Sequence, residues 1–96
     1  MPVTLLDLAA DVMGLAQRGE VAAASRLVAD AAGETTGEDP AHQAAWWYAV
    51  SVVRHIQGDN RRAFEACDRC VALAGEAGSA GWASNGLSMR AMASAR

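Results

Sequence analysis

Two stretches of the chain, "RGEVAAASRLVADA" at 18–31 and "QGDNRRAFEACDRC" at 57–70, share one pattern of residue types. In each, a glycine is followed by an acidic residue and then by small or apolar residues at five, nine and twelve positions after the glycine. The matched pairs are Gly19 with Gly58, Glu20 with Asp59, Ala24 with Ala63, Val28 with Cys67, and Ala31 with Cys70. A helix pair that recurs every 30 to 50 residues or so is typical of helical solenoids, whose units bury their faces against their neighbours.

The composition also favours helices. Hydrophobic residues make up 52% of the 96 residues and aromatic residues only 5%, because 23 of the apolar residues are alanine. Alanine, the strongest helix former, is by far the commonest of them. No stretch alternates β-branched or aromatic residues with polar ones for the length of a strand. A chain of this length forms one small domain with one modest core. We therefore predict a single all-α domain over residues 1–96.

The first two helices are expected from the residues that begin and end them. Thr4 is a suitable N-cap for a helix that runs to about Arg18, where Gly19 ends it. The second helix is expected from about Glu20 to Ala32, and Gly33 can supply the left-handed residue that ends it.

Three further helices are expected in the rest of the chain, over about 40–57, 60–74 and 79–96. Asp39 before Pro40 is a strong helix start, and Asp59 caps the next helix. The stretch "GEAGSAG" at 75–81 separates the last two. The third helix is apolar over more than half of its circumference, so it should be contacted on two sides and lie at the centre of the fold.

The chain resembles the tetratricopeptide (TPR) class of helical repeats. The matching features are the turn of glycine and an acidic residue, the small residues at the contact positions, Trp47 eleven residues before Gly58, and Ser51. The resemblance implies a TPR-like stack of five antiparallel helices. Its parts would be one repeat over about 4–33, a second over about 40–75, and an extra helix over about 79–96. A third repeat at the same spacing would place its turn glycine at position 97, so we expect an excerpt, or an N-terminal region, of a longer array.

This resemblance implies a protein without catalytic activity that mediates protein–protein interaction or dimerisation. The partner would be a protein or peptide, a second copy in a homodimer, or a following domain that covers the apolar face of the fifth helix. An alternative is the N-terminal sensory or regulatory region of a bacterial multidomain signalling protein, such as a diguanylate cyclase or a transcription regulator.

Four residues are candidates for binding a partner: Trp47, Arg54, Arg61 and Arg62. Trp47 falls on a polar stripe of its helix, and tryptophan is enriched at interface hot spots. The arginines cluster at one end of the second helix pair. The plainer alternatives are that Trp47 packs against a neighbouring helix and that the arginines are solvated. In that case Glu65 and Arg69 would form a pair on one helix face.

The two cysteines, Cys67 and Cys70, are spaced as in some redox pairs and metal sites. They are expected two turns inside a helix, and His42 and His55 would lie roughly 6 to 10 Å too far along the helix axis to complete a zinc site. Core packing is therefore the favoured interpretation, and a small thiol or metal protein is the alternative. No catalytic set or phosphate-binding loop can be assembled, so we expect no enzyme and no cofactor, and the histidines are expected at the surface.

Charge and hydropathy exclude two classes of partner. The net charge is −3, with seven acids and two arginines between positions 1 and 40, and four acids and six arginines after position 40. Nucleic-acid binding normally requires a strongly basic face, so it is not expected. No apolar run is long enough to span a membrane. The start of the chain lacks the basic region of a signal peptide, so a cytoplasmic protein is expected.

Overall fold

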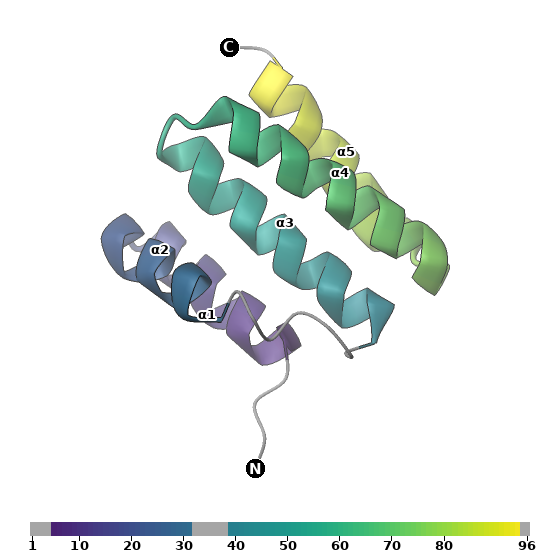
Figure 1. Ribbon diagram of the computed structural model, residues 1–96, viewed down its shortest axis with the longest axis horizontal. Coiled ribbons are helices and arrows are strands. Elements are labelled where there is room, and N and C mark those ends of the chain that lie inside the picture. Colours follow the sequence, from purple (N-terminus) through teal and green to yellow (C-terminus); the bar gives the residue numbers. More distant parts are fainter. Residues whose placement is uncertain (1–4, 32–38, 95–96) are drawn as a thin grey trace.

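The fold is all-α, as predicted. A computed structural model describes residues 5–31 and 39–94, and this part of the chain contains five helices and no strand (Figure 1). The helices are α1 (Leu5–Gln17), α2 (Val21–Asp30), α3 (Pro40–Ile56), α4 (Asn60–Ala77) and α5 (Ala80–Ser94). The expected roles of Thr4 and Gly33 at helix ends lie outside the described residues.

Helix α3 is the centre of the fold, which confirms the prediction from its wide apolar surface. It contacts all four other helices. Helices α1 and α2 lie on one side of it, and α4 and α5 lie on the other (Figure 1). Trp46 and Val53 of α3 are fully buried, together with Leu5 and Val12 of α1. The core is therefore built around α3, with alanines allowing the helices to approach closely.

The predicted start of α3 is confirmed in detail. Asp39 is the N-cap, and its Oδ1 accepts a hydrogen bond of 2.8 Å from the amide of Ala41. Pro40 occupies the first helical position, where no amide donor is needed. Asp59 caps α4 in a similar way, accepting a bond of 3.2 Å from the amide of Arg62.

The turns at Gly19 and Gly58 have the same backbone geometry. Their φ angles are 80° and 79°, in the left-handed region that favours glycine. Each glycine amide donates to the carbonyl three residues earlier, and each following acidic residue donates to the carbonyl five residues earlier, at distances between 2.9 and 3.1 Å. The turn geometry therefore agrees with the pairing of these glycines in the sequence, and the TPR resemblance stays a prediction.

Helix α4 ends later than predicted. The sequence indicated an end near Ala74, before Gly75, but the helix continues to Ala77 and its C-cap is Gly78. Gly78 has a φ of 66° and its amide donates to Gly75, so this glycine reverses the chain. Gly75 itself stays helical, at a cost of about 1 kcal/mol relative to alanine.

Helix α5 contains Asn85 and Gly86, although this pair often forms turns. Gly86 is buried, and a Cβ atom there would lie 2.9 Å from Cγ2 of Val71 and 3.2 Å from Sγ of Cys70. The glycine therefore allows α5 to approach α4 closely, and it does not break the helix.

Candidate functional site

A hollow of about 310 Å³ lies on the surface between α2 and α4, with α3 at its base. We call it the arginine groove. Its lining residues are Val28 of α2, Trp46, Trp47, Val50 and Arg54 of α3, and Arg62, Glu65, Ala66 and Arg69 of α4. The groove thus brings together three of the four residues that the sequence indicated for partner binding.

The arginine groove follows from the antiparallel packing of α3 and α4 about Gly58. In such a hairpin, residues equally far from the turn face each other. Trp47 and Arg69 are each eleven residues from Gly58, and Arg54 and Arg62 are each four residues from it. Steps of three and four residues along a helix keep side chains on one face, so these pairs fall on the same side of the hairpin.

One end of the groove is formed by Trp47 and Arg69. The guanidinium carbon of Arg69 lies 4.8 Å from the centroid of a Trp47 ring, a cation–π contact. Trp47 is half-buried and also packs against the core cluster that contains Cys70 and Ala74. The packing interpretation of Trp47 is therefore confirmed. The same side chain lines the groove, and its role in binding a partner stays a prediction. Arg69 was not among the predicted site residues.

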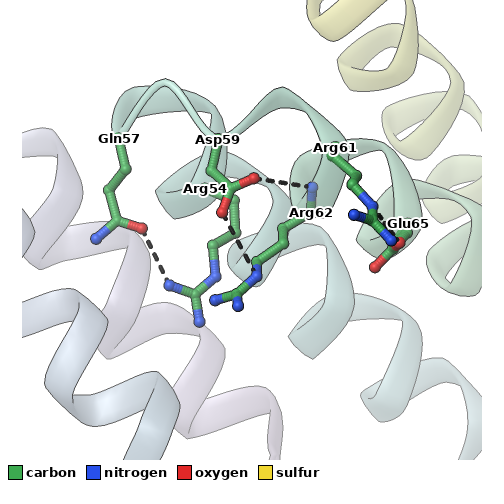
Figure 2. Close-up of polar contacts among 6 residues, drawn as sticks. All are labelled: Arg54, Gln57, Asp59, Arg61, Arg62 and Glu65. Atoms are coloured by element: carbon green, nitrogen blue, oxygen red, sulfur yellow. Dashed lines mark hydrogen bonds and ion pairs between the residues drawn. The ribbon is translucent and has the colours of Figure 1, made fainter.

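The other end is formed by Arg54 and Arg62, which Figure 2 shows on the same side of the turn between α3 and α4. Nη1 of Arg54 donates a hydrogen bond of 3.0 Å to Oε1 of Gln57. Nε of Arg62 lies 3.5 Å from Oδ2 of Asp59, in an exposed ion pair. Arg54 is thus held by a neutral amide, and Arg62 by a carboxylate that also caps α4.

Arg61, the fourth predicted residue, does not line the groove. Its side chain is 90% exposed, and its Nε lies 3.5 Å from Oε1 of Glu65 (Figure 2). The predicted pair of Glu65 with Arg69 is therefore wrong. Both Arg61 and Arg69 are four residues from Glu65, and Arg69 instead contacts the ring of Trp47.

The arginine groove is positively charged over an apolar base. Its lining includes three arginines and one acidic residue, Glu65, whose charge is compensated by Arg61 from outside the groove. The base is apolar, and its members are Val28, Trp46, Val50 and Ala66, all buried. Such a surface can hold an apolar side chain and meet negative charge at both ends.

The cysteines pack in the core, as predicted. Cys67 and Cys70 are fully buried. Burial raises the pKa of the Cys67 thiol, although a hydrogen bond with Ser51 acts in the opposite direction. Burial, together with the neighbouring Cys67, raises the pKa of Cys70 to about 11. These thiols stay protonated at neutral pH, which is the opposite of an activated thiolate.

Metal ligands do not gather in the described part of the chain. No group of three or more His, Cys, Asp or Glu side chains among these residues is placed to hold a metal ion. His42 and His55 are half-buried, which differs from the surface position expected for them.

A second hollow of about 320 Å³ lies over α1, α3 and α5. Its lining is mostly apolar and contains Leu6, Asp7, Ala9, Ala10, Met13, Ala45, Tyr48, Trp82 and Asn85. The rings of Tyr48 and Trp82 lie 5.8 Å apart there, tilted by 54°. No signal in the sequence indicated this hollow, because its residues come from three helices without a shared spacing.

Comparison of the chain with protein-family models, with curated proteins and with solved structures gives no significant match. Among the described residues, no helix combines the length and the apolar character needed to cross a membrane.

Proposed function

We propose that this chain is a non-catalytic protein-interaction module, built as a TPR-like helical stack, and that the arginine groove holds a segment of the partner. The observation that supports the proposal is the grouping of Trp47, Arg54 and Arg62 with Arg69 around one hollow. Tryptophan and arginine are among the side chains most enriched at interface hot spots.

The arrangement of the arginine groove also suits binding. Specific interfaces have an apolar centre and a polar rim, and the groove has this order, with Val50 and Ala66 between the two charged ends. All lining residues stand on helices, so a partner would meet a surface that needs little ordering.

A test of this proposal should not depend on the partner's charge. Random 12-residue peptides displayed on phage would be selected on the chain and then tested on Glu65→Cys carrying a bulky maleimide adduct. Arg26→Cys with the same adduct is the control, because Arg26 is exposed and does not line the groove. The buried Cys67 and Cys70 should not react in the native protein.

We expect the adduct at position 65 to remove binding of the selected peptides and the adduct at position 26 to leave it unchanged. Peptides that bind equally well to both labelled variants would refute a role for the groove. Far-UV circular dichroism would verify that both variants keep their helices.

A second candidate function, self-association, is favoured by α5. Leu87 and Met92 are 51% and 52% exposed there, and a second copy or a following domain of a signalling protein would cover them. Light scattering at several concentrations tests the homodimer. We expect the mass to fall to that of a monomer in Leu87→Asp and to stay dimeric in Ala22→Asp, because Ala22 is exposed on α2 and far from α5. A wild-type chain that is monomeric at every concentration would contradict self-association.

A further inference from the structure

We propose that the arginine groove selects an acidic peptide segment, with two carboxylates separated by about 10 Å, the rise of two helical turns, and an apolar side chain between them. This inference rests on the proposed interaction function and names the chemistry of the partner.

The charge of the groove is the first support. Arg54 contacts the neutral amide of Gln57, and Arg69 contacts the ring of Trp47. These contacts hold the two guanidinium groups in place without neutralising them. An arginine that keeps free donors can form charge-assisted bonds with a carboxylate, often two in parallel. Each end of the groove therefore presents a positioned cation to a partner.

Among the described residues, the acidic side chains beside the groove do not cancel this charge. Asp59 pairs with Arg62 and also caps α4, and Glu65 pairs with Arg61. With these two pairs formed, the charges of Arg54 and Arg69 remain. A negatively charged segment complements them, whereas a basic segment would be repelled.

The spacing of the partner's charges follows from the helix. Trp47, which carries Arg69 on its ring, and Arg54 are seven residues apart on α3, which corresponds to about 10 Å at about 1.5 Å per residue. Val50 and Ala66 lie between these levels and form an apolar base. A segment that fits both features carries an apolar residue between two acidic ones.

A single-stranded nucleic acid is the other anionic polymer to consider, since bases stack on aromatic rings. Among the described residues that line the groove, Trp47 is the only aromatic one besides the buried Trp46. Arg69 covers the Trp47 ring, so the ring is engaged before a base could stack on it. The apolar base of the groove also suits an aliphatic side chain better than a phosphate chain.

The test uses two displayed 12-residue libraries with identical apolar and neutral positions, in which the charged positions are Asp or Glu in one and Lys or Arg in the other. We expect the acidic library to yield at least about ten times more binders. Arg54→Gln and Arg69→Gln should each weaken the best acidic peptide about three- to tenfold by fluorescence anisotropy. Arg26→Gln is the matched control and should leave the affinity unchanged.

Several outcomes would overturn the proposal. One is an equal or larger yield from the basic library, and another is an unchanged affinity in the double variant Arg54→Gln/Arg69→Gln. If a labelled 12-nucleotide oligo-dT bound more tightly than the best acidic peptide, the groove would be assigned to nucleic acid instead. If the peptides selected from the random library were neutral and lost their binding to the labelled Glu65→Cys variant, the acidic preference would be refuted. The interaction function would still stand. If no peptide of any kind depends on the groove, both proposals fail.

Discussion

Substituting Gly86 by alanine tests how closely α5 packs against α4. The added methyl group would lie 2.9 Å from Cγ2 of Val71 and 3.2 Å from Sγ of Cys70. Non-bonded carbon atoms prefer separations of about 3.5 to 4.0 Å, so at least one group must move. Val71 is β-branched and has one strongly preferred rotamer in a helix, and Cys70 is fully buried. Relief therefore requires the two helices to separate.

The expected size of the effect is a difference between two terms. Replacing glycine by alanine inside a helix stabilises it by about 1 kcal/mol. Overpacking a well-packed core costs about 1 to 3 kcal/mol. Gly86→Ala should therefore lower the free energy of unfolding by about 0 to 2 kcal/mol. Gly75→Ala is the control, because nothing lies within 4 Å of a Cβ atom there, and it should raise that free energy by about 0.5 to 1 kcal/mol.

Urea denaturation followed by circular dichroism measures both variants. In a second comparison, Gly86→Ala is added to the variant Val71→Ala. There it should lower the free energy of unfolding by less than half as much, because the contact with Cγ2 of Val71 is gone. The reasoning would be wrong if Gly86→Ala stabilised the protein as much as Gly75→Ala does. It would also be wrong if Gly86→Ala lowered the free energy of unfolding equally with valine and with alanine at position 71.

Three further predictions concern the turn and the buried thiol. Gly58→Ala should lower the free energy of unfolding by about 1 to 2 kcal/mol in urea melts, since alanine is strained at a φ of 79°, and Gly58→Asn should lower it less. Asp59→Ala should cost about 1 kcal/mol through loss of the α4 cap, whereas a loss as large in Asp59→Asn would contradict this cause. The raised pKa of Cys70 favours the folded state below pH 9.0, so stability should fall as the pH rises from 9.0 to about 11, by at most about 1.4 kcal/mol per pH unit. In urea melts at several pH values, Cys70→Ala should therefore show a smaller fall of stability between pH 9.0 and about 11 than the unchanged chain does.

The helix starts could be predicted because short-range chemistry decides them. Asp39 accepts a bond from an amide two residues later, and Asp59 accepts one from an amide three residues later. Such contacts need no information about the rest of the fold. The left-handed turns at Gly19 and Gly58 are local in the same sense.

The features that the sequence did not reveal depend on contacts between helices. The end of α4 at Gly78, and not at Gly75, is a choice between two nearby glycines of equal intrinsic preference. The contact of Arg69 with Trp47 replaces the local pair with Glu65 because α3 brings an aromatic ring within reach. Gly86 resembles a turn residue until its distance to α4 is known.

The arginine groove lies between these cases. Its α3 and α4 members could have been found by counting equal distances from Gly58, which places Arg69 opposite Trp47. Its third wall could not, because Val28 of α2 is related to α3 only through tertiary packing, and nine residues separate the end of α2 from the start of α3.

The spacing about the glycine turns separates structural positions from those that can carry specificity. Residues five, nine and twelve after each glycine are buried in both helices, namely Ala24, Val28 and Ala31 in one stretch and Ala63, Cys67 and Cys70 in the other. The residues just before two of them, at four and eleven, are Arg62 and Arg69 after Gly58, and both are exposed and line the groove. After Gly19 the same positions hold Ala23 and Asp30, which carry no positive charge. Inserting one residue after Gly58 would rotate α4 by about 100° and expose its buried face. Core packing therefore fixes where Arg62 and Arg69 lie relative to α3. The buried positions thus recur while these neighbours differ. Packing therefore fixes the fold and leaves the adjacent face free to vary, as the proposed interaction function requires.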